Sequence, residues 1–178
     1  MIKEFSVHPK PSNKKSKIFF LISFLISALG ILLYLMMDMY KGIVGIFAIL
    51  MLTTSILIYT KFIAVELYYD ITFDTNETPI FVVRQLTGKR QTTLCRINLA
   101  DINSVRHESR EEYKRHKTPK GVRRYIYAPT LFPKEVYRVF GKNRYESYEL
   151  IIECSSDFAD LLLEYAKEAK LLESESEE

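Results

Sequence analysis

Two long runs of uncharged residues dominate the first third of the chain. The first reads IFFLISFLISALGILLYLMM (18–37) and the second GIVGIFAILMLTTSILIYT (42–60). A helix of twenty residues covers roughly 30 Å, the hydrocarbon thickness of a bilayer. Neither run has the polar stripe that a long helix of a soluble protein keeps toward water. We therefore predict a transmembrane hairpin over residues 18–63, with spans at 18–37 and 42–60 and a short connection at Asp38–Lys41.

The flanking charges predict how this hairpin is oriented. Residues 1–17 form a basic arm, whereas Lys41 in the connection is offset by Asp38; the lysines of the arm are Lys3, Lys10, Lys14, Lys15 and Lys17. Positive residues stay on the cytoplasmic side. The first run is also longer than the apolar region of a signal peptide, and no small-residue cleavage site follows it. We predict a two-span protein of the inner (plasma) membrane with both termini cytoplasmic, in which Cys95 and Cys154 are free thiols.

Beyond Glu66 the pattern changes to short alternating segments separated by turn residues, which is typical of β-strands. The sequence TGK at 87–89, between two such segments, indicates a compact hairpin. We predict seven strands at residues 66–73, 80–86, 90–99, 102–108, 124–128, 135–140 and 145–154.

The period then changes to that of a helix. From Asp157 to Leu172, apolar residues recur at spacings of three and four, and acidic and basic residues fill the other positions. Ser155 and Ser156 are suitable N-cap residues. The pattern predicts an amphipathic helix over 157–172, followed by a solvated acidic tail, ESESEE, at 173–178.

Two segments carry a resemblance to a known family: CRINLADINSV (95–105) and ELIIECSSDFADLLLEYA (149–166). Together with the preceding hairpin they resemble the bacterial membrane-anchored proteins with a pleckstrin-homology-like (PH-like) domain. The resemblance implies an α+β fold, in which the membrane α-helical hairpin precedes a cytoplasmic PH-like domain at 64–172. That domain is expected to be a seven-stranded β-sandwich or barrel closed by the C-terminal amphipathic helix.

Charge is distributed unevenly along this second region. Residues 84–144 hold sixteen Lys or Arg against five Asp or Glu, and residues 145–178 hold two against eleven. Inner membrane leaflets are anionic and attract cations held close to them. The basic segment between the fourth and fifth predicted strands supplies the candidate headgroup-binding residues: Lys114, Arg115, Lys117, Lys120, Arg123 and Arg124.

Several interpretations of the basic segment remain open. It is a solvated loop, a contact for anionic lipid, or a docking site for an acidic protein, of which the chain's own tail at 173–178 is one example. The sequence argues against nucleic acid, because it contains no recognisable binding module. The turn DTNETP (74–79) is acidic and unsuited to phosphate, which favours generic anion binding over specific inositide recognition.

The chain offers no arrangement of residues typical of catalysis. Its three histidines lack metal-ligand spacing, and His107–Glu108 beside His116 suggests surface polarity at a strand end. No phosphate loop or nucleophile motif is present. Ser23 and Ser27 supply a small-residue face for packing against the second span or another copy. We predict a non-enzymatic binding or scaffolding module that needs no cofactor or metal and contacts anionic lipid or an acidic partner. The alternative is an accessory subunit of a membrane enzyme or transport complex, associating through the hairpin with a membrane-protein partner or as a homo-oligomer.

Overall fold

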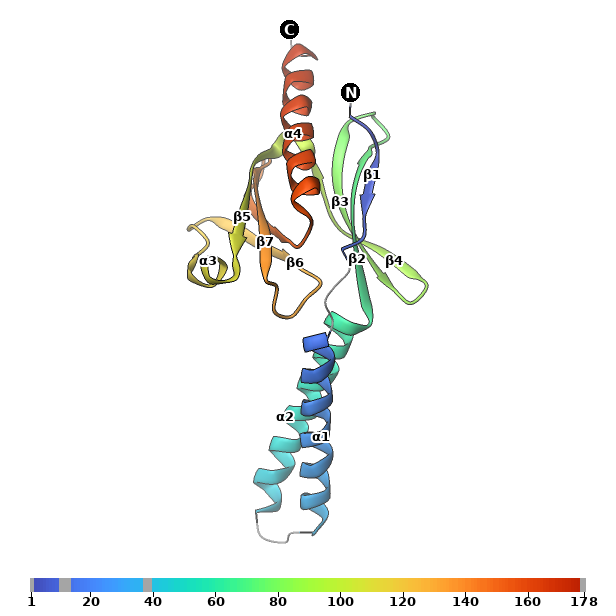
Figure 1. Ribbon diagram of the computed structural model, residues 1–178, viewed down its shortest axis with the longest axis vertical. Helices are drawn as coiled ribbons and strands as arrows, with labels where there is room; N and C mark the ends of the chain where they lie inside the picture. The colour runs from blue at the N-terminus through green and yellow to red at the C-terminus, as the bar shows by residue number, and fades with distance from the viewer. Residues whose placement is uncertain (1, 10–13, 37–39, 177–178) are drawn as a thin grey trace. The chain divides into compact units, whose positions relative to one another are not determined.

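The computed structural model describes residues 2–9, 14–36 and 40–176, and the chain divides into two compact units (Figure 1). The β unit comprises Met1–Lys10, Glu66–Pro129 and Pro133–Glu178, and the helical unit comprises Pro11–Val65 and Thr130–Phe132. Lys10 of the arm, the predicted connection around Asp38, and the tail residues Glu177 and Glu178 lie outside the described residues.

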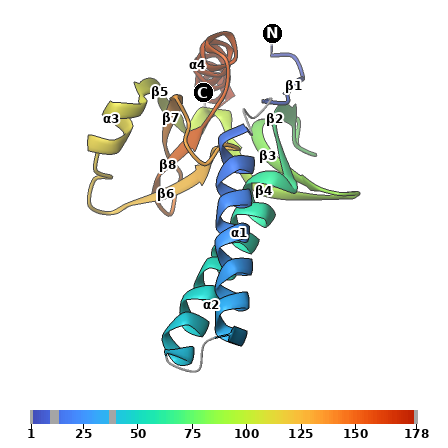
Figure 2. The same cartoon turned by 60° about the horizontal axis from the view of Figure 1, so that its bottom comes forward.

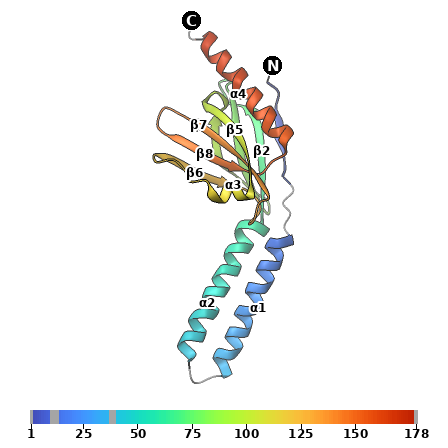
Figure 3. The same cartoon turned by 60° about the vertical axis from the view of Figure 1, so that its left-hand side comes forward.

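The helical unit contains the two apolar runs. Helix α1 covers Lys14–Met36, α2 covers Lys41–Ile58, and the π-helix η1 (Tyr59–Ile63) continues α2. Both helices are long and apolar enough to cross a membrane, and most of their large apolar side chains are exposed. Figure 3 shows them side by side. The two predicted apolar helices are thus present, joined to a β-rich unit.

A seam of small residues brings α1 and α2 together. The Ser23 hydroxyl donates to the Met51 carbonyl at 3.0 Å, and the Ser27 hydroxyl donates to the Ala48 carbonyl at 3.0 Å. At Gly30 a Cβ atom would lie 2.9 Å from the Cβ of Ala48, so a larger residue would force the helices apart. The small-residue face of the first run therefore packs against the second helix of the same chain.

The β unit consists of two four-stranded sheets and three helical segments. Sheet A has the order β1-β2-β3-β4, with β1 at Phe5–Val7, β2 at Val65–Phe73, β3 at Pro79–Thr87 and β4 at Arg90–Asn98. The 3₁₀ turn η2 (Leu99–Asp101) leads into sheet B, which has the order β5-β7-β8-β6. Its strands are β5 (Ile102–Ser109), β6 (Val122–Tyr127), β7 (Glu135–Lys142) and β8 (Ser147–Ile152); helix α3 covers Arg110–Arg115 and α4 covers Ser156–Ser176.

This topology corrects the predicted fold in two respects. The described residues hold eight strands rather than seven, because Phe5–Val7 of the basic arm pairs with Tyr69–Ile71 of β2. The sheets also do not close into a barrel. Strand β6 pairs parallel to β8, whereas β7 is antiparallel to both β5 and β8, so the strand order of sheet B departs from the chain order. The coarser prediction of an α+β unit with a C-terminal helix is confirmed.

Aromatic side chains form the core of the β unit. The ring of Phe158 on α4 stacks with Tyr69 of β2 and lies near Phe81 of β3, with ring centroids 6.2 and 6.3 Å apart. The Tyr69 hydroxyl donates to the Tyr127 carbonyl at 2.6 Å and accepts from the Glu153 N–H at 3.2 Å, which links sheet A to sheet B. Burial raises the pKa of this hydroxyl, so it remains a neutral donor.

Helix α4 is longer than its apolar period predicts. It continues past Leu172 to Ser176, and the Asn98 side chain donates to the Glu173 carboxylate at 2.7 Å. The first part of the predicted solvated tail is therefore helical. Because Glu173 contacts Asn98, at the end of β4, this part of the tail does not lie over the basic segment. Both cysteines are free thiols.

Candidate anion-binding surface and the charged layer beneath it

The basic segment between β5 and β6 packs on sheet B, and we call residues 110–121 the cover segment. It begins with α3, whose N-terminus carries a capping box. The Glu112 carboxylate accepts from the Ser109 N–H at 2.8 Å, and the Ser109 hydroxyl accepts from the Glu112 N–H. The hydrogen bond from the Ser109 N–H, and a second one that the Ser109 hydroxyl donates to the same carboxylate at 2.8 Å, hold the pKa of Glu112 below its ordinary value. The pattern Ser-x-x-Glu at 109–112 is a helix-start signal, so α3 was detectable in the sequence.

Beneath the cover segment, one face of sheet B carries buried charges. Arg138 of β7 donates from Nη2 to Glu108 Oε2 of β5 at 2.6 Å and from Nη1 to Glu149 Oε1 of β8. Arg138 and Glu149 are fully buried and Glu108 is 8% exposed. In the register, Arg138 lies opposite Ile151, and Glu149 lies opposite Phe140, so the two charged residues are diagonal neighbours on one face. We call Glu108, Arg138 and Glu149 the charged layer.

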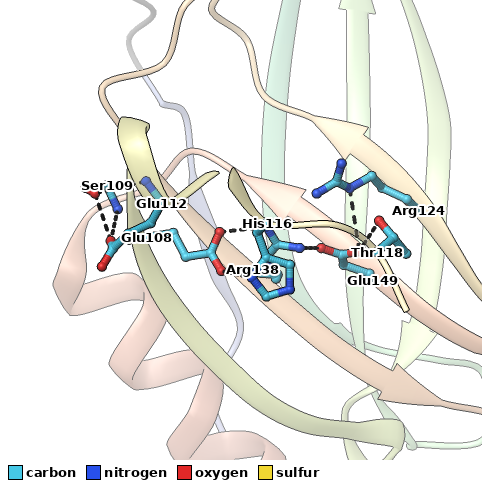
Figure 4. A network of polar contacts seen from close by, with 8 residues as sticks. All are labelled: Glu108, Ser109, Glu112, His116, Thr118, Arg124, Arg138 and Glu149. Atoms are coloured by element: carbon cyan, nitrogen blue, oxygen red, sulfur yellow. Dashed lines mark hydrogen bonds and ion pairs between the residues drawn. The ribbon is translucent and has the colours of Figure 1, made fainter. Parts of the chain in front are cut away.

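The cover segment contacts this layer through His116 and Thr118 rather than through its lysines. His116 Nδ1 lies 3.1 Å from Glu108 Oε1, and the Thr118 hydroxyl donates to Glu149 Oε2 at 2.8 Å. The ring of Tyr113 lies 5.6 Å from the guanidinium carbon of Arg124. Figure 4 shows His116, Thr118 and Arg124 converging on the charged layer. Of the carboxylate oxygens that Arg138 does not bond, Glu108 Oε1 therefore lies against His116, and Glu149 Oε2 accepts from Thr118 and forms an ion pair with Arg124 of β6.

The predicted headgroup-binding residues separate into two groups. Lys114, Arg115, Lys117 and Lys120 are exposed on the cover segment, and Arg123 at the start of β6 is exposed beside Glu146, with a separation of 3.0 Å. Arg115 lies 3.9 Å from Glu111. Arg124 instead points inward, with its Nε 3.5 Å from Glu149 Oε2 and only 27% of its side chain exposed. Arg124 therefore belongs with the charged layer rather than with the exposed cations.

The interpretation of Glu108 and His116 as surface polarity was wrong. Glu108 is buried because β5 lies beneath the cover segment, and His116 is its partner. His107, by contrast, is half-exposed, with its ring nitrogen 3.5 Å from the exposed carboxylate of Glu135. Arg138 and Glu149 were not singled out from the sequence at all. Arg138 and Glu149 each lie between apolar or aromatic neighbours in the sequence. This pattern is typical of a side chain on the solvent-facing side of a strand.

The buried charges of the layer are matched within the β unit. Each charge of the layer has an oppositely charged partner within the protein, which stabilises it in a buried position. Across the part of the chain that the structure describes, no group of three or more His, Cys, Asp and Glu side chains could hold a metal ion. What remains accessible is a set of cations on a segment whose inner side is fixed.

Comparison of the chain with protein-family models, with curated proteins and with solved structures finds no match.

Proposed function

We propose that the protein is a membrane-anchored, non-enzymatic module whose cover segment binds anionic lipid headgroups. The observation that carries this proposal is the exposure of three cations, Lys114, Lys117 and Lys120. These side chains are exposed and form no ion pair with any described residue. Their backbone belongs to a segment anchored by His116 and Thr118. Cations held in this way lose less conformational freedom on binding an anion than cations on a mobile loop.

The two apolar helices support the membrane part of the proposal. In this proposal α1 and α2 span the inner membrane, and the positive residues Lys14, Lys15 and Lys17 keep the N-terminus cytoplasmic. Two spans then return the chain to the cytoplasmic side, where the β unit meets an anionic leaflet. Each cation near such a surface gains about 1 kcal/mol. Anchoring raises the local concentration, so weak contacts of this size become effective.

The β unit is, in this proposal, a variant of the PH-like arrangement. Support comes from the succession of strands in sheet A, the corner at η2 and the C-terminal helix α4 packed against the core. The cover segment and the parallel strand β6 would be additions to that arrangement. Such additions would place the anion-binding surface on sheet B rather than at the first hairpin, where Asp74 and Glu77 disfavour phosphate.

Lysine reactivity in lipid nanodiscs tests the proposal without altering the protein. The full chain is placed in discs of phosphatidylcholine alone or mixed with phosphatidylglycerol, pulsed with an acetylating reagent and analysed by mass spectrometry. We expect the acetylation rates of Lys114, Lys117 and Lys120 to fall about fivefold in the anionic discs, the factor that corresponds to about 1 kcal/mol per cation. The protection should disappear near 1 M salt, where the Debye length is about 3 Å.

Lys167 is the matched control, because it is exposed on α4 among acidic residues. Its acetylation should be the same in both kinds of disc, apart from any general effect of surface pH. Equal rates for the three cover-segment lysines in neutral and anionic discs would contradict lipid binding. Protection that is already present in neutral discs would point to a protein contact instead.

A further inference from the structure

The hairpin formed by β3 and β4 is a second basic region of the β unit. Its two-residue turn has Gly88 at φ +61°, as a type II′ hairpin turn requires at its first position. Beyond the turn, all residues from Arg90 to Leu94 are exposed. In Figure 2 this hairpin extends to the right, and α3 lies on the left, so the two basic regions are separate. Strand β4 is an edge of sheet A.

The free edge of β4 presents backbone groups at known positions. Thr87 and Arg90 close the two-residue turn and are therefore a hydrogen-bonded pair. Hydrogen-bonded and non-hydrogen-bonded pairs alternate along an antiparallel ladder. It follows that the N–H and C=O groups of Gln91 and Thr93 point away from β3, whereas those of Thr92 point toward it. An added strand would bond to Gln91 and Thr93.

A bulge places a groove next to this edge. The register shifts between Val83 and Arg84, so Leu94 has no partner on β3, and its carbonyl accepts from the Tyr127 hydroxyl at 3.4 Å. The groove beside it has a volume of about 240 Å³ and a mixed lining. Its apolar and aromatic walls come from Leu94, Ile97, Tyr125, Tyr127 and Leu150, and its more polar walls come from Cys95, Arg96, Asn143, Glu146 and Tyr148. It is smaller than the roughly 300–1,000 Å³ of pockets for drug-sized ligands, which suits a single side chain.

The charges around the free edge of β4 indicate which charge a segment bound there would carry. Residues 84–94 contain no Asp or Glu, and Lys89 and Arg90 form no ion pair with the described residues. The charges at the rim of the groove are already matched, since Arg96 bonds Asp74 at 2.7 Å and Glu146 lies 3.0 Å from Arg123. The hairpin is therefore complementary to acidic residues, and the groove to an uncharged side chain.

We propose that the free edge of β4 binds an extended acidic segment of a partner protein as an added strand, with one large apolar side chain in the groove. Main-chain hydrogen bonds to Gln91 and Thr93 give the affinity, and the groove and the basic turn give the specificity. This site is independent of the headgroup-binding surface of the cover segment. Either one can fail without the other.

A labelled peptide tests the proposal on the full chain in discs of neutral phosphatidylcholine. The probe is a fluorescent heptapeptide of alternating glutamate and valine with a central phenylalanine, and binding is followed by anisotropy. We expect saturable binding that weakens about tenfold when glutamine replaces glutamate and about tenfold when alanine replaces the phenylalanine. These two comparisons leave the protein unchanged, so folding cannot confuse them.

Two protein variants locate the site. Thr93→Pro removes an outward N–H, which an edge strand tolerates, and should reduce binding at least tenfold with an unchanged circular dichroism spectrum. Lys117→Glu, in the cover segment, should leave peptide binding unchanged. Absence of binding to the wild-type chain, or equal binding to the Thr93→Pro variant, would overturn the proposal. So would a dimer of this chain that Thr93→Pro dissociates, because the occupant of the edge would then be a second copy.

Discussion

Each face of sheet B carries buried side chains, but the two faces bury them by different means. One face is apolar, and its side chains Val139, Leu150 and Ile152 are almost inaccessible in the interior of the β unit. The other face carries Glu108, Arg138 and Glu149, which are also buried beneath the cover segment. Burial of the first face is favourable by itself. Burial of the second face is tolerated only while its charges are paired and hydrogen-bonded.

The difference has a consequence for the cover segment. An apolar face attracts any apolar partner, whereas the charged layer needs donors at defined positions. Thr118 and His116 occupy such positions, and they fix the backbone between them. The buried charges thus specify where the cover segment lies. Because the exposed lysines are carried on this segment, the charges also specify where the lysines lie.

The largest effect should come from removing the central cation of the charged layer. Arg138→Leu leaves the buried carboxylates of Glu108 and Glu149 without their common partner, and it should cost about 3–5 kcal/mol of unfolding free energy. Denaturant unfolding of the full chain in detergent micelles measures it. Arg106→Leu is the matched control, because Arg106 lies directly opposite Arg138 but is exposed, and its change should stay within about 0.5 kcal/mol. A similar cost for both variants would contradict the special role of the layer.

A smaller effect is expected where the cover segment meets the layer. Thr118→Val keeps the shape of the side chain but removes the donor to Glu149, and leaving that buried oxygen with one bond fewer should cost about 1–3 kcal/mol. Thr118→Ser keeps the hydroxyl and should retain most of the stability. The same unfolding experiment compares the two variants. If Val and Ser behave alike, the hydrogen bond does not hold the cover segment.

On the apolar face, the corresponding change is milder. Ile152→Val deletes one methylene group from a fully buried side chain and should cost about 1 kcal/mol. Because no charge is involved, the cost should be equal at low and high salt. A cost that depends on salt would show that the two faces are not energetically distinct.

The smallest effect concerns the capping box of α3. Glu112 has a pKa lowered by hydrogen bonds from Ser109, so its contribution is present above its ordinary value of 4.5 and is lost as the pH falls through the lower, folded value. Carboxyl NMR should find the Glu112 midpoint below 4.5, and Ser109→Ala, which removes the hydroxyl donor but keeps the backbone N–H, should shift the midpoint part of the way upward. Glu112→Ala should weaken α3 at neutral pH more than Glu111→Ala, because Glu111 is not part of the box. An unchanged Glu112 midpoint in Ser109→Ala would exclude a contribution from the Ser109 hydroxyl.

Sequence patterns predicted most of the elements but not the charged layer. Alternation located the seven strands from β2 to β8, and the helical period located α4, because both depend on apolar burial. Strand β1 has only three residues, too few for a pattern, and its pairing depends on β2, more than sixty positions away. Alternation also placed Glu149 on the other face of β8 from Leu150 and Ile152. In the sequence, the face that carries Glu149 resembles one exposed to solvent. Periodicity tells which side chains share a face, but not whether a later segment covers it.

Hydrogen–deuterium exchange of the cover segment, in the full chain in neutral nanodiscs, measures whether sheet B holds residues 110–121 in place. The Arg110 N–H donates to the Lys134 carbonyl at 3.0 Å and the His116 N–H to the Glu112 carbonyl at 2.9 Å. We predict that both amides exchange more than about tenfold slower than in an unstructured chain, and that Glu149→Gln removes much of the protection at His116. Exchange at the unstructured rate in the wild-type protein would mean that residues 110–121 are a solvated loop, and the account would be wrong.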